Sequence, residues 1–85
     1  MDNLNVKKAD GRIEPWSNDK IVAAIGRAGV PVEAAQSTAK AVTAWARGAA
    51  EKGVIASTLI RDKVIELLKK EFPAQSDSFS AYKKY

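Results

Sequence analysis

The dipeptide Asp10-Gly11, between two short arms that each carry an apolar residue, constrains this chain most. A two-residue type I′ turn needs a positive φ at both central positions, which glycine adopts freely and aspartate tolerates. We therefore predict a β-hairpin with strands over about residues 4–9 and 12–16. A lone hairpin is only marginally stable in water, so this one must pack against the rest of the chain.

The turn type also determines which residues pair across the hairpin. A two-residue turn predicts the pairs Ala9 with Arg12, Lys8 with Ile13 and Lys7 with Glu14. Pro15 has no backbone N–H, so the second strand should end there or turn that side away from its neighbour.

The chain after Trp16 has the apolar periodicity of helices. We predict helices over about residues 18–28, 32–52, 58–72 and 76–84, with Ser17 and Ser57 as N-caps and Gly29 just past the first helix. The β-branched residues 54–55 could add a third strand. The predicted fold class is α+β, mostly α: a short N-terminal hairpin, two- or three-stranded, that caps a four-helix bundle.

Apolar residues at helical spacing predict which side chains are buried. The expected core consists of Ile21, Ala24, Ile25, Ala28, Ala35, Ala39, Val42, Ala46, either Ala49 or Ala50, Ile60, Val64, Leu67, Leu68, Phe79, Tyr82 and Tyr85, with Trp16 under the hairpin.

The composition narrows the range of functions. The 85 residues predict one domain over 1–85, and 14 Lys and Arg against 10 Asp and Glu favour an anionic partner. The sequence has no Cys and no His, so disulfides, Cys-based zinc sites and the commonest general base are excluded. It contains no P-loop, no GxGxxG motif, no long apolar run and no basic signal-peptide start. We expect a cytoplasmic, non-catalytic protein.

Three basic residues, Lys8, Lys20 and Arg61, are candidates for binding an anion. Lys20 and Arg61 fall in the first turns of predicted helices, where a cation opposes the helix dipole unless an anion lies nearby. Glu14 could accept a hydrogen bond from an adenine amino group or a ribose hydroxyl. The alternatives are that Lys8 protects a strand edge, Glu14 pairs with Lys7, Ser57 only caps its helix, and Lys20 and Arg61 are solvated.

Two stretches resemble the ATP-cone domain. Val6-x-Lys8-x-Asp10-Gly11-x-x-Glu14-x-Trp16, followed by Lys20-Ile21 and Gly29-Val30, resembles the start of that family. Its second half is similar to Gly53-Val54-Ile55-x-Ser57-x-x-Ile60-x-x-x-Val64 and to Ala81-Tyr82-x-x-Tyr85. The resemblance implies a small β-sheet over four helices.

The resemblance also implies a function. ATP-cones bind ATP or dATP as an allosteric switch in ribonucleotide reductases and in a bacterial repressor of reductase genes. It implies that the Val6 backbone contacts base or ribose, that Lys8 and Lys20 hold phosphates, and that Glu14 reads base or sugar. The full expected nucleotide site is Val6, Lys7, Lys8, Gly11, Arg12, Glu14, Lys20, Ser57 and Arg61. The ligand is ATP or dATP, with or without Mg²⁺, and we expect no protein metal site.

The implied protein partner is a reductase catalytic subunit or a second copy of the chain. Nucleic acid and membrane are not expected partners. No catalytic barrel or zinc ribbon accompanies these 85 residues, so we expect an excised domain or a free-standing cone that acts in trans.

Ala9 departs from the family, which usually has arginine after the lysine that corresponds to Lys8. A lost charge-assisted contact costs about 1.5–3 kcal/mol, or about one to two orders of magnitude in affinity. Arg12 could replace the missing guanidinium. The alternatives to nucleotide binding are a degenerate cone that serves as a protein-interaction module and a small basic nucleic-acid-binding domain.

Overall fold

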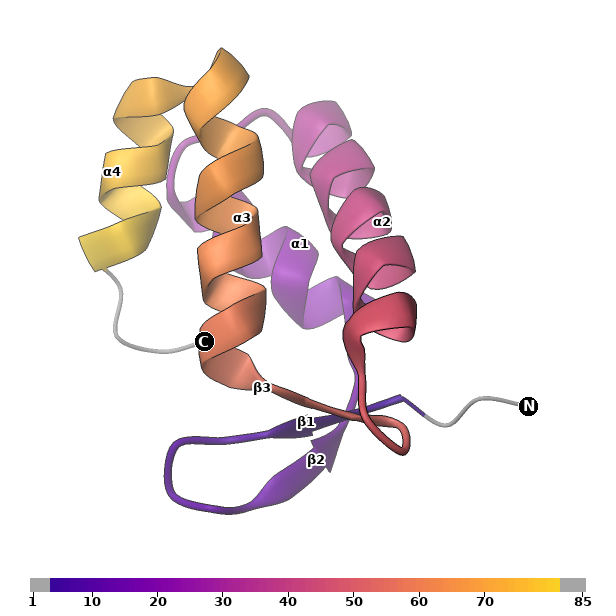
Figure 1. Ribbon diagram of the computed structural model, residues 1–85. Coiled ribbons are helices and arrows are strands. Elements are labelled where there is room, and N and C mark those ends of the chain that lie inside the picture. Colours follow the sequence, from indigo (N-terminus) through magenta and orange to yellow (C-terminus); the bar gives the residue numbers. More distant parts are fainter. Residues whose placement is uncertain (1–3, 82–85) are drawn as a thin grey trace.

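The structure is a computed structural model that describes residues 4–81. It contains four helices and a small three-stranded sheet, which confirms the mostly helical α+β class (Figure 1). The elements are β1 (Asn5–Lys7), β2 (Ile13–Pro15), α1 (Asn18–Arg27), α2 (Val32–Ala49), β3 (Val54–Ala56), α3 (Ser57–Glu71) and α4 (Pro73–Ala81). In Figure 1 the sheet lies below the helices, with α4 along α3 and α1 crossing behind α2 and α3.

The strand β1 is the centre of the sheet. It pairs antiparallel with β2 and parallel with β3, in the order β2-β1-β3. Parallel strands need a crossover connection, and α1 and α2 lie within the one between β1 and β3. The third strand predicted at residues 54–55 is therefore confirmed, and it brings the start of α3 next to the hairpin.

The predicted pairing of the hairpin is wrong by one residue. The structure pairs Asn5 with Pro15, Val6 with Glu14 and Lys7 with Ile13. The Lys8 N–H donates to the Arg12 carbonyl at 2.8 Å, so these two residues form the last pair before the loop. The strands are also shorter than the predicted ranges, at three residues each.

The loop of the hairpin explains this difference. Three residues, Ala9, Asp10 and Gly11, connect the strands, and the Gly11 N–H donates to the Lys8 carbonyl at 3.0 Å. Gly11 has a φ of +92°, whereas Asp10 is not in the positive-φ region. This is a type I turn followed by a left-handed glycine, the usual three-residue hairpin. The Asp10 carboxylate favours it by accepting from the Arg12 backbone N–H at 3.1 Å and from Arg12 Nε at 2.7 Å.

A turn with two positive φ values does occur, at Lys52-Gly53. Lys52 has a φ of +53° and Gly53 a φ of +77°, and Glu51 and Val54 exchange backbone hydrogen bonds of 2.9 and 3.0 Å across them. These are the features of a type I′ turn. It reverses the chain before β3, and α2 accordingly ends at Ala49, three residues before the predicted end.

The helix ends confirm some predictions and correct others. The Ser17 hydroxyl caps α1 by accepting from the Lys20 backbone N–H at 3.3 Å, and Gly29 follows that helix with a φ of +102°. Ser57 is not a cap, because α3 begins at Ser57 itself and Ala56 holds the cap position without a side-chain bond. The last helix begins at Pro73, earlier than predicted, since proline suits a first helical position. Its predicted end, with Tyr82 and Tyr85, lies outside the described residues.

The core lies between the helices and one face of the sheet. Most of the predicted residues in the described range are buried: Ile21, Ile25, Ala28, Ala35, Ala39, Val42, Ala46, Ile60, Val64, Leu68 and Phe79, joined by Val6 and Ile55 from the sheet. Trp16 packs against this core, partly buried, and its Nε1 donates to Thr43 Oγ1 at 3.2 Å. The sheet is therefore fastened to the helices through β1, β3 and the residue that follows β2.

Candidate functional site

Three basic side chains surround the carboxylate of Glu14. Lys8 Nζ lies 4.0 Å and Lys20 Nζ 3.9 Å from Glu14 Oε1, and Arg12 Nη1 lies 3.8 Å from Oε2. Lys8 follows β1, Arg12 precedes β2, Glu14 is on β2 and Lys20 is in the first turn of α1. Residues from three parts of the chain thus form one group, which we call the cation cluster (Lys8, Arg12 and Lys20).

The observed register brings this group together. Side chains alternate between the two faces of a strand, so Lys8 shares the face of the buried Val6. Cross-strand pairing then adds Glu14 opposite Val6 and Arg12 opposite Lys8. This face is turned toward the helices, where α1 supplies Lys20. The predicted register paired Arg12 with Ala9, on the face opposite to that of Lys8. In the structure Arg12 instead pairs with Lys8, so a replacement of the family's arginine by Arg12 depends on the face that Arg12 shares with Lys8.

The cation cluster is partly open to solvent. The Lys8 and Glu14 side chains are 27% and 30% exposed, whereas those of Lys20 and Arg12 are 70% and 68% exposed. The distances to Glu14 are those of loose ion pairs and exceed hydrogen-bond length. The cluster presents two ammonium groups with three donors each and one guanidinium with five, and Arg12 also bonds to Asp10. The donor set is suited to a ligand that brings several negative oxygens.

Arg12 has a second acidic partner, Asp10. The hydrogen bond from the Arg12 backbone N–H, with the bond from its side chain, lowers the pKa of the Asp10 carboxyl below its ordinary value of 3.8. Asp10 therefore stays ionised and holds the guanidinium of Arg12 beside the loop. The loop thus positions the Arg12 guanidinium at the edge of the cation cluster.

The other predicted site residues lie in different surroundings. Lys7 is exposed and pairs with Ile13, on the sheet face opposite to that of Val6. Gly11 shapes the loop through its backbone. The alternation of the antiparallel ladder makes Val6 and Glu14 a hydrogen-bonded pair, so the backbone groups of Val6 face β2.

The two predicted site residues on α3 are directed elsewhere. Ser57 is buried at the start of the helix. Arg61 is half-buried, and its Nη2 donates to the carbonyl oxygen of Ser80 near the end of α4. The last carbonyls of a helix attract cations, which accounts for this partner. Among the described residues, Arg61 forms no ion pair with Glu14, the carboxylate that the cation cluster surrounds.

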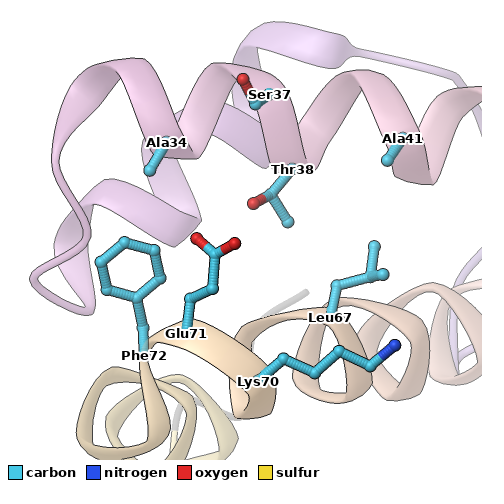
Figure 2. A pocket seen from close by; sticks show the side chains of 8 residues that line it. All are labelled: Ala34, Ser37, Thr38, Ala41, Leu67, Lys70, Glu71 and Phe72. Atoms are coloured by element: carbon cyan, nitrogen blue, oxygen red, sulfur yellow. The ribbon is translucent and has the colours of Figure 1, made fainter.

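A groove of about 410 Å³ lies between α2 and α3 (Figure 2). It is at the ends of these helices that are far from the sheet, as the course of α2 and α3 in Figure 1 shows. Figure 2 shows Thr38 on α2 facing Glu71 and Leu67 on α3, with Phe72 at one end. We did not predict it from the sequence, although its small residues Ala34, Thr38 and Ala41 recur at helical spacing. Its charged lining is one lysine, Lys70, and one glutamate, so it has no preference for an anion.

Residues 4–81 contain no group of three or more potential metal-ligating side chains. None of their helices is both long and apolar enough to cross a membrane.

The family of the chain follows from comparison with known proteins. A family model described as the ATP cone domain matches residues 4–85, which is nearly the whole chain. A search of curated proteins finds none that matches. The family match covers β1, the loop, β2 and the start of α1, the segments that form the cation cluster. The chain therefore belongs to the ATP-cone family, whose members are non-catalytic regulatory domains that bind adenine nucleotides.

Proposed function

We propose that this chain binds ATP or dATP at the cation cluster and uses that binding to regulate a partner protein. The observation that carries the proposal is the meeting of Lys8, Arg12 and Lys20 around Glu14. Three cations from separate segments are suited to a triphosphate, which offers several negative oxygens along a flexible tail. Family membership supports adenine as the base.

Each residue of the cluster has a distinct chemical role in this proposal. The ammonium groups of Lys8 and Lys20 act as point charges on the phosphates, and the planar guanidinium of Arg12 offers paired donors. Glu14 would read the base or the sugar. Mg²⁺ that accompanies the nucleotide would be held mainly by the phosphates, because proteins bind it with one or two carboxylates at most in such sites.

The regulated partner that we propose is a ribonucleotide reductase subunit or a repressor of reductase genes. The support is the resemblance of the chain to ATP-cones that act in those proteins. Regulation requires that the nucleotide bind two conformations of the domain or its assembly with different affinity. ATP and dATP differ by one hydroxyl, so their relative effects on assembly with a partner would report on that switch.

The test is calorimetric titration of ATP, dATP and GTP, with and without Mg²⁺, into the native chain and two lysine variants. Lys20→Gln removes a cation of the cluster, and we expect about a tenfold weaker affinity for ATP. Lys70→Gln removes the same charge from the groove at the other end of the helices, and we expect less than about a twofold change.

The outcomes separate the proposal from its alternatives. Binding of adenine nucleotides in preference to GTP, weakened by Lys20→Gln alone, would support it. No response to any nucleotide would indicate a degenerate cone that serves as a protein-interaction module. DNA binding with a steep salt dependence would instead favour the nucleic-acid alternative.

A further inference from the structure

We propose that Glu14 is the internal counter-ion of the cation cluster and competes with the phosphates of a bound ligand for Lys8, Arg12 and Lys20. This inference rests on the proposed function and extends it to how the site controls its own affinity. It assigns Glu14 a role toward phosphate, separate from any contact with base or sugar.

The geometry of the carboxylate carries the inference. Glu14 uses both of its oxygens: Oε1 faces Lys8 and Lys20 at 4.0 and 3.9 Å, and Oε2 faces Arg12 at 3.8 Å. Asp10 bonds only to Arg12, so Glu14 alone among the described carboxylates lies within 4.0 Å of all three cations. Its side chain is 30% exposed, so the carboxylate is partly open to solvent.

The electrostatic effect of Glu14 is favourable in the ligand-free protein and unfavourable when a polyphosphate is bound. Without a ligand, three cations near one another repel, and the carboxylate at their centre offsets that repulsion. With a polyphosphate bound, the carboxylate of Glu14 lies close to the negative phosphate oxygens and repels them. Glu14 therefore stabilises the ligand-free protein and weakens phosphate binding. A ligand must bring more negative charge than one carboxylate in order to replace it.

The exchange also has a mechanical consequence. Glu14 is on β2 and Lys20 is on α1, so their ion pair connects the hairpin to the helices. A triphosphate that binds Lys20 in place of Glu14 breaks this ion pair. The contact between β2 and α1 is then made by the ligand.

The test uses tripolyphosphate, which has no base or sugar, in titrations of the native chain, Glu14→Gln and Glu33→Gln. Glu33 is exposed in the first turn of α2, so Glu33→Gln changes the net charge equally without touching the cluster. We expect Glu14→Gln to bind tripolyphosphate about three- to tenfold more tightly than the native chain, and Glu33→Gln to differ by less than about twofold. Without ligand, Glu14→Gln should melt about 2–6 °C lower, and tripolyphosphate should recover the loss.

Each outcome decides between the two proposals. Equal affinities for tripolyphosphate in Glu14→Gln and Glu33→Gln would overturn the role of Glu14, while ATP binding by the native chain would leave the proposed function intact. Tighter tripolyphosphate binding by Glu14→Gln, with no ATP binding by any form, would support the role of Glu14 and overturn the nucleotide proposal. Failure of every form to bind tripolyphosphate or ATP would overturn both.

Discussion

Lys20 Nζ on α1 lies 3.9 Å from Glu14 Oε1 on β2, the same oxygen atom that Lys8 Nζ approaches at 4.0 Å. The two lysines belong to different structural layers, since Lys8 follows a strand and Lys20 begins a helix. Their meeting at one atom places three ion pairs, those of Glu14 with Lys8, Arg12 and Lys20, at the junction of hairpin and helices.

Arg12 should supply the guanidinium that the family usually has at the position of Ala9. We expect Arg12→Ala to weaken ATP binding about tenfold, because a charge-assisted contact is lost. Ala9→Arg in the Arg12→Ala background should restore most of that affinity, which calorimetric titration would measure. An affinity for ATP that is unchanged in Arg12→Ala would rule this compensation out.

Gly11 should be required because of its backbone conformation, and not because a side chain at this position would clash with its neighbours. A Cβ built at Gly11 meets nothing within 4 Å, but its φ is +92°. We expect Gly11→Ala to lower the free energy of unfolding by about 1–2 kcal/mol in urea denaturation. Gly26→Ala is the matched control, since its Cβ also meets nothing but its φ is not in the positive region. Alanine should stabilise that helix by about 0.5–1 kcal/mol. Changes of the same sign at both positions would contradict this account.

Arg61 should matter more for the attachment of α4 than for the nucleotide. Arg61→Met keeps an apolar stem but loses the bond to the Ser80 carbonyl, and we expect a loss of about 1.5–3 kcal/mol in the free energy of unfolding. Amide hydrogen exchange in α4 should accelerate, whereas ATP affinity should change less than it does in Lys20→Gln. Unchanged amide hydrogen exchange in α4, together with a large loss of ATP affinity, would instead indicate that Arg61 belongs to the nucleotide-binding site.

Asp10 should make the stability of the hairpin depend on pH in the acidic range. Its pKa is lowered in the folded chain, so its stabilising contribution is fully present above about pH 5 and is lost as pH falls through the folded pKa. The difference in free energy of unfolding between the native chain and Asp10→Asn should therefore shrink as pH falls from about 5 through the folded pKa. NMR titration of the Asp10 carboxyl carbon would measure the pKa, which should move part of the way back in Arg12→Ala because only the side-chain bond is lost. Titration of native Asp10 at or above 3.8 would be inconsistent with the loop geometry.

Much of the fold could be predicted because its signals are local. The helical spacing of Ile21 and Ile25, the glycine after α1 and the β-branched pair before α3 each depend on a few neighbouring residues. The hairpin register could not be predicted, because Asp10-Gly11 is compatible with a two-residue or a three-residue loop. Contacts of the Asp10 carboxylate with Arg12 accompany the second, and spacing alone does not reveal them.

The candidate site was predictable to a similar extent. A cation in the first turn of a helix suggested a ligand anion near Lys20. The structure places the carboxylate of Glu14 3.9 Å from Lys20, and binding of a ligand there stays a prediction. The same signal at Arg61 has another explanation, because the nearest acceptor is a carbonyl of α4. A partner on a neighbouring helix depends on tertiary packing, which single-sequence periodicity does not encode.

The central claim is that the nucleotide binds where the hairpin meets α1, and amide chemical shifts during an ATP titration test it most directly. The account predicts that the largest shifts fall on Lys8, Arg12, Glu14 and Lys20, with small shifts at Thr38 and Phe72 in the groove between α2 and α3. Saturable shifts concentrated on the groove residues, with the hairpin and the first turn of α1 unmoved, would contradict it.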